Sequence, residues 1–314
     1  MLSDIDDTPE FLKYINFTVS GISLFAGLFV ISVYFFFKEI RLFIYETIML
    51  LCVGRVIMDI SSFFPINDKD GEIPSNLCRI QGAIMYGFQK YTWIMCTYLL
   101  YFTYIYGLNK KYLNKNAKVI RLVFFSFALV ISFSFGGLVY YMNVISYNGL
   151  VCGLSNKQSD YKHINFTMIV ISILIDFFFI FLNVYLLIKS VRSMKELIES
   201  NPEFKKIFTV IKYFPILKFV GWLPNLISLI YTIYDGNGNI NVILSLTVTI
   251  TIFSSIFTSI CGVIYLWLPH VRISVKAFLK RICGGKNELD LLEENDFFDI
   301  MEARKSEVRP PRDD

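Results

Sequence analysis

The chain has 314 residues, 55% of them hydrophobic, and its mean hydropathy is +0.54. A soluble globular domain is about 45–50% apolar and interrupts its apolar runs often, whereas here runs of about twenty apolar residues recur along most of the chain. The net charge is only +4, so the sequence has no basic footprint for nucleic acid. These figures exclude an ordinary soluble domain and favour a membrane protein.

Seven apolar segments are long enough to cross a hydrocarbon core of about 30 Å as helices that rise about 1.5 Å per residue. In chain order, the sequence predicts them over 14–37, 42–64, 80–106, 119–142, 164–188, 213–234 and 240–268. The sixth helix begins before its apolar part, because Asn201 and Pro202 are typical of an N-cap and the first helical residue. The expected fold is an all-α integral membrane protein with a seven-transmembrane helix bundle over 14–268.

The two flanks of this bundle differ in character. Residues 1–13 form an acidic, polar tail. After the bundle, an apolar stripe flanked by basic residues predicts a short amphipathic helix on the membrane surface over 269–285; its members are Val271, Val275, Leu279 and Ile282. Cys283 at its end is either a palmitoylation site or a plain free thiol. The acidic stretch 286–314 is expected to be a disordered cytoplasmic tail.

The positive residues of the connecting segments predict the orientation of the bundle. One set of segments holds 17 lysines and arginines: 38–41, 107–118, 189–212 and 270–286. The other set holds 4: 1–13, 65–78, 143–163 and 235–239. Cytoplasmic loops carry the excess of such residues. We therefore expect a multi-pass plasma-membrane protein with an extracellular N-terminus and a cytoplasmic C-terminus.

Two of the six cysteines are expected on the outer side. Cys78 precedes the third helix, and Cys152 lies between the fourth and fifth. Disulfides persist on the oxidising side of the membrane and not in the cytosol. The sequence therefore predicts a disulfide between Cys78 and Cys152, with two free thiols as the alternative. Such a bond would hold the loop 143–163 over the mouth of the bundle.

Four ionisable residues are expected near the middle of the membrane. Counted from the predicted helix ends, Arg55, Lys90 and Asp176 lie about 14–18 Å from the outer surface, and Asp59 lies one turn from Arg55. One interpretation is internal pairing of Arg55 with Asp59 and of Lys90 with Asp176. The other is the floor of a ligand pocket whose cations bind an anionic ligand, which Arg79 at the rim would attract first.

A second pair of charges is expected nearer the cytosol. Glu46 lies about 6 Å from the inner end of the second helix, and Lys218 about 8 Å from the inner end of the sixth. A Glu46–Lys218 ion pair would hold the sixth helix closed and would break on activation. The alternative is that the Lys218 side chain extends to the inner surface.

Trp222 and Pro224 mark a candidate hinge in the sixth helix. Proline removes a backbone hydrogen bond and kinks a helix. Trp222 beside Pro224 resembles the Trp-x-Pro hinge of many receptors. The alternative is a tolerated proline beside a packing tryptophan. In the seventh helix, small polar groups and a tyrosine share one face, which predicts either helix packing or pocket lining; they are Thr247, Thr251, Ser254, Thr258, Cys261 and Tyr265.

This layout resembles a G-protein-coupled receptor. The third helix opens with Cys78-Arg-Ile-Gln81-Gly82 and carries Trp93, an arrangement similar to the cyclic-AMP-receptor-like family, class E, of amoebae and related eukaryotes. The resemblance covers about 14–285. It implies a receptor that passes the signal of an extracellular ligand, cyclic AMP or another anion, to a cytoplasmic heterotrimeric G protein. The seventh helix differs from the family in lacking a Gln-Gly pair and an Asn near its inner end.

Other functional classes have less support. The aspartates of the apolar segments lie on different helices and both histidines lie outside these segments, so we expect no enzyme, no metal site and no cofactor. A retinal photoreceptor would need a lysine in 240–268, which has none. The alternative to a receptor is a multi-pass transporter or channel that uses the mid-membrane charges, although no internal repeat supports it. The expected partners are a small-molecule ligand, a G protein and the lipid bilayer.

Overall fold

A computed structural model describes most of the chain. The described residues are 10–37, 43–64, 66, 75–142, 144–147, 151–154, 162–195, 199, 202–234, 240–267, 271–272 and 274–276. The predicted tail 286–314 and Cys283 lie outside them, as do residues 1–9. Of the predicted eighth helix, only 271–272 and 274–276 are described, and they are helical. The chain divides into two units, Met1–Val271 and Arg272–Asp314, and the first contains the bundle.

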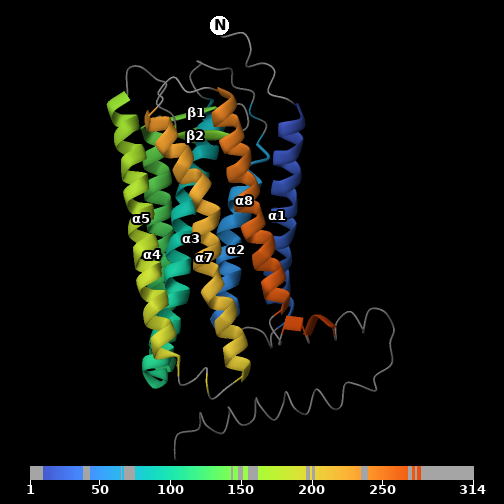
Figure 1. Cartoon of the computed structure of the whole chain (residues 1–314), viewed down its shortest axis with the longest axis vertical. Coiled ribbons are helices and arrows are strands. Elements are labelled where there is room, and N and C mark those ends of the chain that lie inside the picture. The colour runs from blue at the N-terminus through green and yellow to red at the C-terminus, as the bar shows by residue number, and fades with distance from the viewer. Residues whose placement is uncertain are drawn as a thin grey trace, which may run out of the picture. The chain divides into compact units, whose positions relative to one another are not determined.

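Long helices packed side by side form this first unit (Figure 1). In chain order they are α1 (Glu10–Phe36), α2 (Phe43–Ser61), α3 (Asn76–Leu108), α4 (Lys110–Tyr141), α5 (Lys162–Ser193), α7 (Pro202–Tyr234) and α8 (Ile240–Trp267). α3 packs against α2, α4, α5 and α7, and α8 packs against α1, α2 and α7. More than half of the residues of α3 are buried. α3 is therefore the helix around which the bundle is organised.

Five of the described helices are long and apolar enough to cross a membrane. The spans are Phe11–Phe36, Lys115–Tyr141, Phe166–Ser193, Ile211–Tyr231 and Ser245–Val263. α2 and α3 differ from these five in composition. α2 holds three charged residues in 19, and α3 holds Arg79, Lys90 and six tyrosines. Many large apolar side chains on the outside of the helices are exposed, as the lipid-facing surface of a membrane protein requires. The chain is a helical, membrane-embedded, multi-pass protein.

The helix ends show where the sequence prediction was wrong. α4 begins at Lys110, nine residues before the predicted start at 119, because Asn109 caps the helix. The Asn109 side chain accepts a hydrogen bond of 2.9 Å from the backbone N–H of Tyr112. The basic segment predicted as a loop is thus mostly the first turns of a helix. α3 also begins early, at Asn76, where Ser75 is the N-cap.

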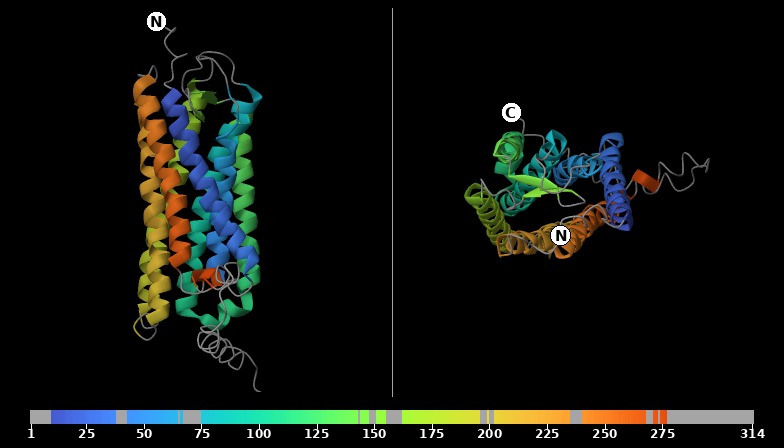
Figure 2. Two further views of the ribbon diagram at one scale, coloured as in Figure 1. Left: turned by 90° about the vertical axis from the view of Figure 1, so that its right-hand side faces the viewer. Right: turned by 90° about the horizontal axis from the view of Figure 1, so that it is seen from above.

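A short β-hairpin connects α4 to α5 and was not predicted. β1 (Ile145–Tyr147) and β2 (Cys152–Leu154) pair in antiparallel fashion, with Ile145 opposite Leu154. A disulfide joins Cys152 to Cys78 in the first turn of α3, which confirms the predicted bond. Seen from this end, the hairpin lies across the bundle (Figure 2). The disulfide therefore fixes the hairpin over one mouth of the bundle.

Gln81 and Gly82 hold the hairpin against α3. The Gln81 side chain accepts a hydrogen bond from the backbone N–H of Cys152 and donates one to the carbonyl oxygen of Ser61, both at 2.8 Å. A Cβ at Gly82 would lie 2.6 Å from the side chain of Ile145, so only glycine lets β1 approach α3 this closely. The residues Cys78, Gln81 and Gly82 thus share one structural task, which is docking the hairpin.

Candidate functional site

Asp176 of α5 is the centre of a buried polar cluster that joins three helices. Its carboxylate accepts from Lys90 Nζ at 2.6 Å and from Gln89 Nε2 at 3.3 Å, both on α3. It also accepts from Trp222 Nε1 of α7 at 2.9 Å. Asp176 and Lys90 are both fully buried. A charged pair without water is tolerated only when further hydrogen bonds satisfy it, and Gln89 and Trp222 provide them.

The hydrogen-bond acceptors of the Lys90 ammonium group all lie on α5. Besides Asp176, its ammonium group donates to the Oγ of Ser172 at 2.9 Å and to the carbonyl oxygen of Ser172 at 3.2 Å. These three acceptors match the three donors of an ammonium group. The ring centroid of Phe135 on α4 lies 5.0 Å from Lys90 Nζ. Lys90 therefore ties α3 to α5 in the interior of the bundle.

A second buried pair joins α2 to its neighbours. Arg55 Nη2 lies 2.8 Å from Asp59 Oδ1, one turn along the same helix. Asp59 also accepts from Ser23 Oγ of α1, and Arg55 donates to Ser255 Oγ of α8 at 3.3 Å. The pair thus connects α2 to both α1 and α8 through two serines.

These contacts are those of internal pairing, one of the two interpretations that the sequence left open for the mid-membrane charges. Arg55 bonds Asp59, and Lys90 bonds Asp176. The use of the same residues as a ligand pocket stays a prediction. In this arrangement Lys90 has no donor left for a ligand, since its three acceptors all come from the protein.

The predicted Glu46–Lys218 ion pair is wrong. Glu46 instead accepts two hydrogen bonds of 2.8 Å from Arg121 Nη1 of α4. A guanidinium group binds a carboxylate better than an ammonium group does. Arg121 lies near the start of the predicted fourth helix, and the sequence did not indicate it as a partner of Glu46. The Lys218 side chain lies 5.4 Å from the ring centroid of Trp93 and 5.9 Å from that of Phe257.

Lys218 therefore lies with the two buried ion pairs, Lys90–Asp176 and Arg55–Asp59, and not in a separate layer near the cytosol. We call these five charged groups the central cluster. Trp93 is one turn from Lys90 on α3, and Lys218 is one turn from Trp222 on α7. The charged groups that act on Lys218 include Arg55, Asp176 and Lys90. The predicted partner of Lys218 was wrong because the depth of a residue along one helix does not show which neighbouring side chains a long lysine reaches.

Arg79, predicted to lie at the rim of a pocket, contacts α4. Its Nη2 donates to the carbonyl oxygen of Tyr140 at 2.8 Å, and its guanidinium carbon lies 4.4 Å from the centroid of the Tyr140 ring. Hydrogen bonding and cation–π attraction both hold it there. Arg79 thus links α3 to α4 near the mouth that carries the hairpin.

Trp222 contacts several aromatic rings besides Asp176. Its indole is edge-on to Trp93 of α3 and to Phe177 of α5, with ring centroids 6.2 and 5.8 Å apart. Pro224 lies two residues further along, inside the helix, and so does Pro215 at a lower turn. A proline inside a helix leaves one carbonyl oxygen without its usual intrahelical partner. α7 therefore has two weakened turns on either side of its contacts with the cluster.

The polar face of α8 is turned into the bundle, as predicted. Thr247, Thr258, Cys261 and Tyr265 are buried, and Tyr265 packs edge-on against Tyr45 of α2 at 5.8 Å between ring centroids. The side chain of Ser254 lies outside the described part of the chain. Helix packing thus accounts for most of this face.

Sequence reasoning missed the polar side chains that complete the cluster. They are Ser23, Gln89, Ser172 and Ser255, each on a different helix from the charged group it contacts. The available signal was a small polar residue inside an apolar run, which is common in membrane helices and says little by itself.

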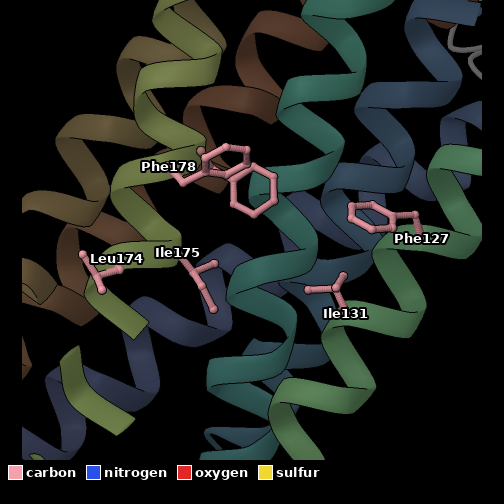
Figure 3. Close-up of a pocket in the computed structure, with 6 residues that line it drawn as sticks. Phe127, Ile131, Leu174, Ile175 and Phe178 are labelled. Carbon is pink, nitrogen blue, oxygen red and sulfur yellow. The ribbon is translucent and has the colours of Figure 1, made fainter. Parts of the chain in front are cut away.

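An apolar groove lies outside the cluster, between α4 and α5. It has a volume of about 330 Å³ and is lined by Phe127, Ile131, Leu174, Ile175, Phe178 and Phe179. Figure 3 shows these side chains on the two facing helices. Leu174 and Phe178 are more than half exposed, so the groove opens toward the surroundings of the bundle.

Neither a metal centre nor a known family accounts for the cluster. Within the described ranges, no three His, Cys, Asp or Glu residues are placed to hold a metal ion. No model of a protein family matches the chain, and no curated protein sequence matches it either. The geometry of the cluster is therefore the basis for the function proposed for this protein.

Proposed function

We propose that the chain is a seven-transmembrane receptor, resembling the cyclic-AMP-receptor-like family, that transmits an extracellular ligand signal to a heterotrimeric G protein. In this proposal α2 and α3 also cross the plasma membrane. The N-terminus is extracellular and the C-terminus cytoplasmic. The ligand is a small molecule, cyclic AMP or another anion, that acts on the central cluster.

The packing of α2 and α3 supports seven spans. Both helices lie in contact with helices that qualify as spans, α2 with α1 and α8, and α3 with α4 and α5. The buried charges of these two helices are ion-paired in the bundle interior; they are Arg55 and Asp59 on α2 and Lys90 on α3. Ionisable residues inside membranes take this arrangement.

The disulfide supports the orientation. Cys78 and Cys152 lie at one mouth of the bundle, and disulfides persist on the oxidising side of a membrane. The segments rich in lysine and arginine connect the opposite ends of the helices. Both observations support a hairpin on the extracellular side.

The hydrogen bond from Trp222 to Asp176 is the observation that carries the proposal. It joins α7 to a carboxylate that is also bonded to α3. A receptor needs an element with two packings whose balance a ligand shifts. If α7 rotates or bends at Pro215 or Pro224, this bond breaks while the Lys90–Asp176 pair stays intact. α7 is thus the helix best placed to move.

The test is guanine-nucleotide exchange on a panel of G proteins, in membranes that contain the full chain, with cyclic AMP or other small anions. Trp222→Phe keeps an aromatic ring and removes the N–H donor, so we expect altered basal or ligand-stimulated exchange. Tyr185→Phe, at an exposed position on α5, is the matched control and should change nothing. Absence of exchange with every G protein and every anion would contradict the receptor.

A transporter or channel is the second candidate, because buried ionisable residues also mark ion pathways. The four paired groups Arg55, Asp59, Lys90 and Asp176 would then lie along the pathway. Ion flux into liposomes that contain the chain tests this alternative. Flux that Lys90→Met or Asp176→Asn changes, without nucleotide exchange, would favour it over the receptor.

A further inference from the structure

The central cluster contains one more cation than its carboxylates can match. Its charged groups among the described residues are three cations, the buried Arg55 and Lys90 and the half-buried Lys218, and two buried carboxylates, Asp59 and Asp176. Asp59 is paired with Arg55, and Asp176 with Lys90. In the part of the chain that the structure describes, no carboxylate lies within ion-pair distance of Lys218.

Two aromatic rings lie close to the ammonium group of Lys218. Its Nζ lies over the rings of Trp93 and Phe257, 5.4 and 5.9 Å from their centroids. Lys218 is half-buried, and cation–π attraction to the two rings offsets part of the cost of the water that its ammonium group has lost. Arg55 and Lys90 act on Lys218 as like charges, and Asp176 acts on it as an opposite charge. An added negative charge would stabilise this arrangement.

A second observation independently indicates an acceptor near the same place. Arg55 is only 8% exposed, and its Nε has no hydrogen-bond partner among the described residues. Its guanidinium group reaches Ser255, two residues from Phe257, so Arg55 and Lys218 both contact the same turn of α8. A buried donor without a partner is costly and is normally satisfied by protein, water or ligand.

We infer that Lys218, assisted by Arg55, forms a binding site for a single negative charge, a small monovalent anion or the anionic group of a ligand. The preference for one charge follows from the excess of one cation. The inference deepens the proposed function, since it assigns ligand contact to Lys218 in place of Lys90. Its signalling role rests on that function, whereas the binding itself does not.

The experiment measures thermal unfolding of the full-length protein in detergent as acetate or chloride is added at constant ionic strength, with sulfate as the divalent comparison. We expect the Tm of the wild type to rise in a saturable manner with the monovalent anions. Lys218→Gln should lose this rise, and Lys218→Arg should keep it. Lys212→Gln, on the same helix beside Tyr213, is the matched control and should behave as the wild type.

Effects of salt on any protein act equally on all these variants, so the difference between Lys218→Gln and the wild type isolates the site. If Lys218→Gln does not fold, Lys218→Met keeps the unbranched stem, and calorimetric titration with acetate replaces the thermal measurement. An unchanged Tm in the wild type, or an equal rise in Lys218→Gln or Lys218→Met, overturns the inference. A rise that depends on Lys218 without any nucleotide exchange keeps the site and contradicts the receptor.

Discussion

At the scale of single residues, the interior of this bundle shows how charged groups persist away from water. Lys90 uses all three donors on Asp176 and Ser172, and Asp176 accepts from two further donors. The helix positions of these charges, and their pairing as one of two alternatives, could be predicted from the sequence. Their neutral partners could not, because serine and glutamine in apolar helices give no signal of what they contact.

The first prediction concerns the Lys90–Asp176 pair. Lys90→Met leaves Asp176 as an unpaired buried carboxylate, so it should destabilise the fold by about 3–5 kcal/mol. Lys90→Met combined with Asp176→Leu removes both charges and should be less destabilised than Lys90→Met alone. The measurement is thermal unfolding in detergent. If the double variant is the less stable one, the pair contributes net stability and the argument from desolvation fails.

The second prediction replaces the lock expected between Glu46 and Lys218. Because Glu46 contacts Arg121, Glu46→Gln and Arg121→Gln should have non-additive effects on stability. The coupling should be modest, since the Arg121 side chain is 41% exposed. Glu46→Gln and Lys218→Gln should instead be additive. Coupling between Glu46 and Lys218 in such a double-mutant cycle would contradict the observed contact.

At the scale of elements, close approach of α3 and α4 depends on glycine. A Cβ at Gly136 of α4 would lie 2.7 Å from the carbonyl oxygen of Ala83 on α3. One at Gly137, the next residue, would meet nothing within 4 Å. The long apolar helices could be read from the sequence, whereas this contact could not, because two adjacent glycines look equivalent there. The early start of α4 and the hairpin depend on local capping and pairing, which hydropathy does not report.

The third prediction uses these two glycines as a matched pair. Gly136→Ala should destabilise the protein, because backbone atoms of α3 must move to admit the methyl group. Gly137→Ala should be neutral or stabilising by about 0.5–1 kcal/mol, since alanine favours helix over glycine. Thermal unfolding of the two variants gives the comparison. Equal effects at both positions would show that α3 and α4 do not approach as described.

At the scale of the whole molecule, the contacts divide the bundle into a fixed part and a candidate moving part. Hydrogen bonds, the disulfide and close glycine packing hold α2, α3, α4, α5 and the hairpin together. α7 contacts this group through the hydrogen bond from Trp222 to Asp176. The seven helical segments could be read from the sequence. The bond that joins α7 to the buried Asp176 became visible only from the contacts between the helices.

The fourth prediction concerns the disulfide. Replacing Cys78 and Cys152 by serine should lower stability by about 2–4 kcal/mol, because the bond closes a long loop in the unfolded chain. The buried cysteines Cys52, Cys96 and Cys261 should not exchange with the bridge. Thermal unfolding of the double variant measures the effect, with Cys96→Ala as the control for a changed cysteine. A Tm equal to that of the wild type would contradict it.

The disulfide also has a consequence for biosynthesis. Its two cysteines are 74 residues apart, and α3 and α4 lie between them. If α3 and α4 both cross the membrane, Cys78 and Cys152 emerge on the same side only when both insertions have succeeded. If one helix fails to insert, the cysteines end on opposite sides and cannot meet. The bond would therefore form only in correctly inserted molecules. The fraction of molecules in which this cysteine pair is oxidised would measure how often α3 and α4 insert correctly into the bilayer.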